Sequence, residues 1–167
     1  MTGYSPSSRS GDYHPLDVIE RIIDDNDWSS DRRNDKEMIV QAPGRWCDYS
    51  LYFAWNDDAD AVHFTCAFDM RVPREHRRNV HDLLALINEE LWLGHFTIWD
   101  DVGLPMFRHA LPLRGSRGPS PEQVEDILET AIIECERFYP AFQYAIWGGK
   151  SASEAIAAAL IETVGEA

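Results

Sequence analysis

Two neighbouring stretches in the middle of the chain alternate between apolar and polar residues. Residues 47–55 place an apolar side chain at every second position, and residues 62–70 do the same. A period of two indicates strands that are buried on one face. The run Asn56-Asp57-Asp58 lies between them and favours a tight turn. We therefore predict an antiparallel hairpin.

Shorter strands are indicated on either side of this hairpin. Residues 28–33 and 37–42 form one candidate pair, and residues 95–99 and 104–113 form another. A short run rich in Asn, Asp or Gly separates the members of each pair, as is typical of hairpins. These segments together predict one antiparallel sheet.

Four other stretches carry apolar residues at helical spacing. We expect one helix to begin at Pro15, a second over residues 74–92, a third after the capping residue Ser120, and a fourth over residues 151 to about 164. Pro140 lies inside the third helix, and we expect it to kink or break that helix.

These elements predict an α+β fold. The expected architecture counts three strands before the second helix and two after it, which gives a five-stranded antiparallel sheet with helices packed on it, in the order α-β-β-β-α-β-β-α-α. Residues 1–13 are rich in Ser and Gly and are predicted to be a flexible tail, whereas residues 14–167 should form a single domain.

The charge of the chain narrows the classes of partner. Its 167 residues include 29 acidic and 15 basic side chains, a net charge of −14. Such a chain repels phosphate backbones and anionic lipid surfaces, so we expect neither a nucleic-acid nor a membrane partner. Basic residues gather only where acidic neighbours dilute them, at Arg71, Arg74, Arg77 and Arg78. No apolar run is long enough to span a bilayer.

The cysteines and the missing motifs argue against several functions. Cys47, Cys66 and Cys135 are odd in number and widely spaced, which predicts buried reduced thiols and a cytoplasmic protein. The Gly-Lys-Ser run at 149–151 lacks the first glycine of a P-loop. The six histidines show no metal-ligand spacing. We therefore predict no metal, no cofactor and no catalytic residue, and hence a protein that is not an enzyme.

Two small groups of residues remain as candidates for function. Trp92, Trp99 and Phe96 are candidates for a partner or dimer interface, because exposed aromatic residues are typical of contact surfaces. The alternative for Trp99 is that the last helices cover it. A polar pocket is the second candidate, built from His95, Arg108 and His109 on otherwise apolar strands.

Five stretches of the sequence resemble one bacterial family, the YbjN-like proteins. They are HPLDVIE (14–20), CAFD (66–69), INEELWLGHF (87–96), MFRHA (106–110) and YPAFQ (139–143). The resemblance implies a fold like that of type III secretion chaperones. It also implies a role as a sensory-transduction regulator, a description that names no reaction and no functional residue.

The expected function is that of a non-enzymatic regulatory or chaperone-like module in the cytoplasm, which forms a homodimer and binds a segment of an unidentified protein partner. The alternative is a small-molecule sensor or an enzyme that uses the pocket near His95, Arg108 and His109.

Overall fold

The structure is a computed structural model that describes residues 14–164. The predicted tail, residues 1–13, lies outside the described residues. The helices are α1 (Pro15–Asp25), α2 (Arg77–Asn88), α3 (Pro121–Ile146) and α4 (Ala152–Val164), with a 3₁₀ turn, η1 (Arg74–His76), ahead of α2. The strands are β1 (Ser29–Arg32), β2 (Glu37–Pro43), β3 (Asp48–Asn56), β4 (Ala61–Ala67), β5 (His95–Trp99) and β6 (Leu104–Pro112).

The strands form one antiparallel sheet in the order β1-β2-β3-β4-β6-β5. The α+β class and the antiparallel sheet are as predicted, but the expected count of five strands is wrong. All four strand-like stretches ahead of α2 pair with a neighbour, and β1 adds a short edge strand in register with β2.

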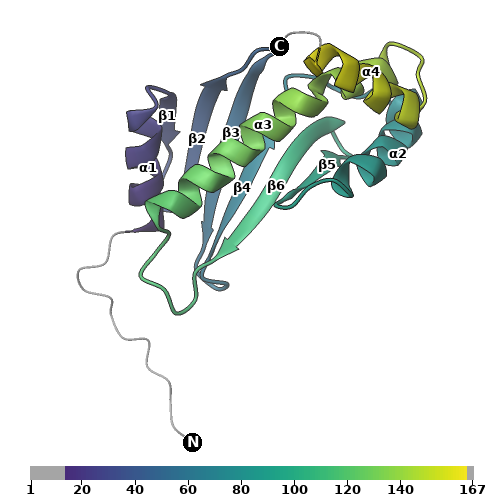
Figure 1. Cartoon of the computed structure of the whole chain (residues 1–167). Helices are drawn as coiled ribbons and strands as arrows, with labels where there is room; N and C mark the ends of the chain where they lie inside the picture. The colour runs from purple at the N-terminus through teal and green to yellow at the C-terminus, as the bar shows by residue number, and fades with distance from the viewer. Residues whose placement is uncertain (1–13, 165–167) are drawn as a thin grey trace, which may run out of the picture.

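The helices lie on one side of this sheet. α3 runs diagonally across it, α1 lies beside β1, and α2 and α4 lie towards β5 (Figure 1). We call the side under α3 the covered face, and the opposite side, on which no described helix lies, the uncovered face. Successive residues of a strand point to opposite faces, so each of the central strands contributes to both.

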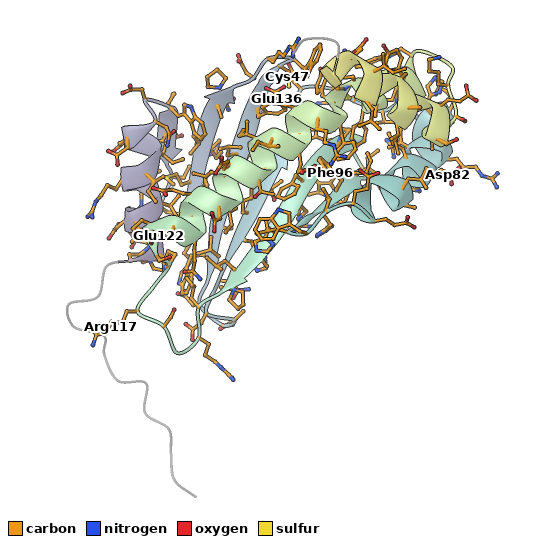
Figure 2. All side chains as sticks on the ribbon, in the orientation of Figure 1. Cys47, Asp82, Phe96, Arg117, Glu122 and Glu136 are labelled. Carbon is orange, nitrogen blue, oxygen red and sulfur yellow. The ribbon has the colours of Figure 1, made fainter. Side chains whose placement is uncertain are left out.

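Aromatic rings fill the space between the covered face and α3. Phe96 is 2% exposed and points into this layer (Figure 2), where its ring lies 5.5–6.0 Å from four others. These four rings belong to Phe68, Phe107, Phe138 and Phe142. Tilted and edge-to-face pairs at such distances stabilise a core beyond the area that they bury.

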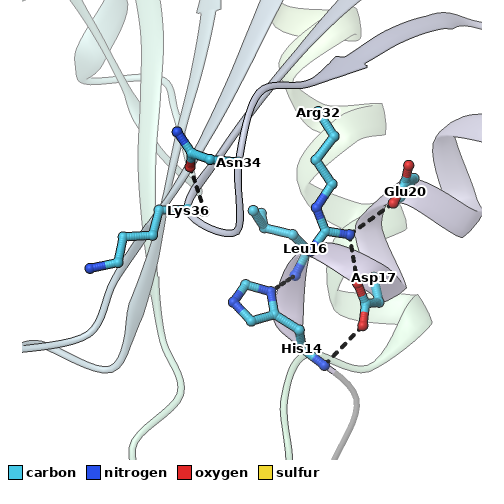
Figure 3. A network of polar contacts seen from close by, with 7 residues as sticks. All are labelled: His14, Leu16, Asp17, Glu20, Arg32, Asn34 and Lys36. Carbon is cyan, nitrogen blue, oxygen red and sulfur yellow. Dashed lines mark hydrogen bonds and ion pairs between the residues drawn. The ribbon is translucent and has the colours of Figure 1, made fainter.

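An ion-pair cluster joins α1 to the edge strand β1 (Figure 3). Arg32 Nη1 donates to Asp17 Oδ1 at 2.6 Å and to Glu20 Oε2 at 2.9 Å. The hydrogen bond from Arg32 is the main reason that the pKa of Asp17 is lowered. Asp17 also accepts from the backbone N–H of His14 at 3.2 Å, so the same carboxylate caps the helix.

Pro140 does not break α3, one of the two predicted effects, and another donor replaces the N–H that proline lacks. In a helix that N–H would bond to the carbonyl of Glu136, four residues earlier. The indole N–H of Trp46 donates to this carbonyl at 3.0 Å. The helix therefore continues to Ile146 without leaving the carbonyl unpaired.

The side chain of Glu136 fastens the turn between β2 and β3 to α3. Its carboxylate accepts from the backbone N–H of Arg45 at 2.6 Å and from the buried hydroxyl of Tyr49 at 3.2 Å. Burial raises the pKa of Tyr49, so its hydroxyl keeps the proton that it donates. Figure 2 shows Glu136 and Cys47, a residue of this turn, at the same end of α3.

α2 ends at Asn88, earlier than the predicted residue 92. The Asn88 side chain turns to the outer edge of β5, where it accepts from the N–H of Phe96 at 2.7 Å and donates to its carbonyl at 3.0 Å. Gly94 makes the tight return into β5. Its φ is +71°, and a Cβ there would lie 2.2 Å from the ring of Phe107, so only glycine fits.

Candidate functional site

The uncovered face carries exposed aromatic side chains, Tyr52 and Trp99, next to a cavity. Register pairs place its residues in rows across four strands. One row contains Ser50, Ala67, Met106 and Thr97, and the next contains Tyr52, Thr65, Arg108 and His95. Trp99 and Leu104 pair at the end of β5 and β6, and Trp99 is 62% exposed.

A hollow of about 510 Å³ lies on this face. It is lined by Tyr52, Thr65, Ala67, Thr97, Ile98, Trp99, Leu104, Met106 and Arg108. Ala67 and Met106 are buried, although no helix covers their side of the sheet, because the larger side chains around them form the walls. We call this feature the sheet hollow. Its size is in the range of about 300–1,000 Å³ that is usual for binding pockets.

The electrostatics of the hollow differ from those of the chain. β4, β5 and β6 contain no Asp or Glu, although the whole chain has a net charge of −14. They carry a basic group, Arg108, with His95 as its register partner. Arg108 is exposed and makes no hydrogen bond or ion pair with any residue from 14 to 164. By contrast, Arg32 and Arg137 each hold two carboxylates.

The predicted polar pocket is brought together only in part. His95 and Arg108 are register partners on the uncovered face. His109 follows Arg108 in β6 and points to the covered face, since adjacent strand residues alternate. Burial, and to a lesser extent the charge of His95, lowers the pKa of His109. The three residues therefore do not line one pocket, and the sheet hollow replaces it as the candidate.

The predicted aromatic interface is divided in a similar way. Trp99 lies at the rim of the sheet hollow, as an exposed contact residue would. Trp92 is 74% exposed, but it lies in the loop between α2 and β5 instead of on a helix. Phe96 is a core residue on the covered face, so its proposed place on a contact surface is wrong.

The other candidate chemistry does not form a site within the described residues. Arg77 of the predicted arginine cluster is held by the carbonyl of Val72 at 3.3 Å and the carboxylate of Asp100 at 3.5 Å. Between residues 14 and 164, no three His, Cys, Asp or Glu side chains are arranged to hold a metal ion. No helix in this range is long and apolar enough to cross a bilayer.

Two of the cysteines lie together in the core. The sulfur atoms of Cys66 and Cys135 are 3.6 Å apart, and all three cysteines are free. Burial raises the pKa of Cys135 and of Cys47, so these thiols stay protonated near neutral pH. Such thiols are poor nucleophiles.

The fold is that of a small α+β protein in which helices cover one face of an antiparallel sheet. The sequence profile described as "YbjN: Putative bacterial sensory transduction regulator" matches residues 15–144. The chain belongs to the YbjN family. A search of curated proteins found no match.

The solved structures that are similar to this chain include the following one. It is described as "Crystal structure of YbjN, a putative transcription regulator from E. coli". The two chains are 15% identical, with a TM-score of 0.52 over 74% of this chain and 88% of the other. At this level of identity the similarity supports the fold.

Several residues of the hollow were not singled out from the sequence. Thr65, Met106 and Tyr52 lie on three strands and face the same side. The alternating pattern shows which residues point away from the core. Only the pairing of the strands shows which of them become neighbours.

Proposed function

We propose that this chain is a non-enzymatic regulatory module that acts, in the manner of a chaperone, by binding a segment of a protein partner. The observation that carries the proposal is the sheet hollow, an apolar depression whose lining includes an exposed tryptophan and an arginine that has no partner among residues 14–164. Trp, Tyr and Arg dominate the binding energy of protein interfaces. Membership of a family of regulators supports a regulatory role.

We also propose a cytoplasmic location and a homodimer. The location is supported by the three free cysteines, since free thiols are typical of reducing compartments. We propose Trp92 as the dimer contact because it is 74% exposed and lies outside the lining of the hollow. The charge of −14 on each copy opposes association, so the dimer should strengthen as salt is added.

Affinity capture with matched variants tests the docking surface. The chain and its Trp99→Ala variant are compared with Trp147→Ala, which removes an equally exposed tryptophan at the end of α3. We expect the wild type and Trp147→Ala to retain one protein partner in saturable amounts, and Trp99→Ala to lose it. Equal retention by all three, or no saturable partner in capture and crosslinking, would contradict the proposal.

Native mass spectrometry at micromolar concentration tests the dimer. The wild type should give a dimer, and Trp92→Ala should shift it to monomer without changing the circular dichroism spectrum. A wild-type monomer across a range of salt concentrations would rule the dimer out.

A small-molecule sensor is the second candidate, favoured by the size of the sheet hollow and by the single basic group at its polar end. Native mass spectra of protein purified from its own host distinguish the two. A stoichiometric protein partner supports the first function, and a retained small ligand supports the second.

A further inference from the structure

We infer that the segment bound in the sheet hollow is an acidic one, with a carboxylate placed on Arg108 and an aliphatic or aromatic side chain seated between Met106 and Trp99. This inference rests on the proposed function and specifies the chemistry of the partner.

The charge distribution supports an acidic partner. Arg108 stands on a face whose three neighbouring strands contain no carboxylate. It has no partner among the described residues. Its register neighbours on the uncovered face are His95 and Thr65, which can add hydrogen-bond donors beside the guanidinium. A guanidinium binds a carboxylate with two parallel hydrogen bonds, and this pairing is worth most on a water-poor surface.

The geometry sets the spacing of the partner's residues. Leu104, Met106 and Arg108 follow one another at every second position of β6, so their side chains are about 7 Å apart. An extended segment lying along β6 places an apolar residue two or four positions from its carboxylate. In a helical segment, residues three or four positions apart match the spacing of about 7 Å between Met106 and Arg108.

A second copy of the chain fits this face poorly. Two uncovered faces in contact would bring two Arg108 side chains together, and β4, β5 and β6 offer no carboxylate to separate them. Strand addition at the β5 edge is also hindered, because Asn88 already occupies the N–H and the carbonyl of Phe96. The partner is therefore expected on the face of the sheet.

A phage-displayed library of random twelve-residue peptides tests the inference with the full chain as bait. We expect the wild type to enrich peptides with Asp or Glu two to four positions from an aliphatic or aromatic residue. Arg108→Glu should enrich Lys or Arg at that position instead. Arg78→Glu, an equal change of charge on the exposed surface of α2, should select the wild-type peptides.

Affinities of one selected peptide complete the test. Arg108→Ala should raise the Kd at least about tenfold, since hydrogen bonds to a charged partner are strong. Replacing the peptide's acid by its amide should have the same effect, and the two changes together should cost no more than either alone. Sodium octanoate, a free amphipathic carboxylate, should compete only weakly.

The outcomes separate this inference from the proposed function. Apolar peptides that need Trp99 but show no acidic preference would overturn the inference and leave the docking face intact. Peptides that bind the Trp99→Ala and Arg108→Ala variants as tightly as they bind the wild type would overturn both proposals. Tight binding of octanoate with no peptide enrichment would overturn both in favour of a small-molecule site.

Discussion

The two faces of the sheet are built from the same strands and have opposite character. Phe96 and Trp99 lie three residues apart in β5. Phe96 is 2% exposed and packs against four other aromatic rings, whereas Trp99 is 62% exposed at the rim of the hollow. The covered face is fastened by carboxylates such as Glu136, which reach hydrogen-bond donors on other elements. The uncovered face has an arginine and no carboxylate on β4, β5 or β6.

The difference indicates that the covered face stabilises the fold and that the uncovered face is accessible for binding. Side chains on the covered face are paired or packed, so their loss should lower the free energy of unfolding. The exposed side chains of the sheet hollow, such as Trp99 and Arg108, are mostly in solvent, so their loss should affect binding instead. Substitutions on the two faces and in the contacts between elements should therefore change the free energy of unfolding by different amounts.

The largest effect is expected from Phe96→Ala. It removes a fully buried ring and should lower the free energy of unfolding by about 3–5 kcal/mol. Trp99→Ala on the same strand should lower it by less than about 1 kcal/mol, because most of its ring is already in water. Urea denaturation followed by far-ultraviolet circular dichroism measures both. Similar losses would show that the two faces do not differ as described.

Glu136→Ala should rank second. The buried Tyr49 hydroxyl and the Arg45 N–H would both lose their acceptor, which should cost about 2–3 kcal/mol in the same denaturation experiment. Glu129→Ala, an exposed residue on the same helix, is the control and should change the free energy by less than about 0.5 kcal/mol. If the two variants unfold alike, the carboxylate is not a fastening point.

A double-mutant cycle tests why α3 continues through Pro140. Trp46→Phe leaves the carbonyl of Glu136 without its donor and should cost about 1 kcal/mol. Pro140→Ala supplies a backbone N–H for that carbonyl. Its effect on the free energy of unfolding should therefore be about 1 kcal/mol more favourable in the Trp46→Phe protein than in the wild-type protein. Additive effects in urea denaturation would contradict this explanation.

The smallest effect is expected at the ion-pair cluster of α1. Because Arg32 lowers the pKa of Asp17, the pair stabilises the folded state above the ordinary aspartate pKa of about 3.9, and this contribution is lost as the pH falls through the lower, folded value. The pair is partly exposed, so Asp17→Asn should cost less than about 1 kcal/mol at pH 7 and almost nothing near pH 2.

Urea denaturation at both pH values measures this difference, and 1 M NaCl should reduce it at pH 7. An equal cost at low and neutral pH would show that capping of the helix, and not the charge of the pair, is what Asp17 contributes.

The sequence by itself determined the class of fold and most of its elements. The alternating pattern of residues 47–55 and 62–70 predicts β3 and β4, because a half-buried strand needs one apolar side chain in every two. Helical spacing likewise predicts α1 and α3, and the family resemblance is confirmed by the match over residues 15–144. These are local signals, carried by residues close together in the chain.

Other features depend on contacts between residues far apart in the chain, and only the tertiary structure shows them. Pro140 remains inside a helix because Trp46, more than ninety positions earlier, supplies the missing donor. β1 takes its place at the edge of the sheet by pairing with β2 and by the ion pair of Arg32 with α1. Strand pairing also brings Arg108 beside Thr65 and His95, and the neighbours on a face of the sheet are defined only once the strands are in register.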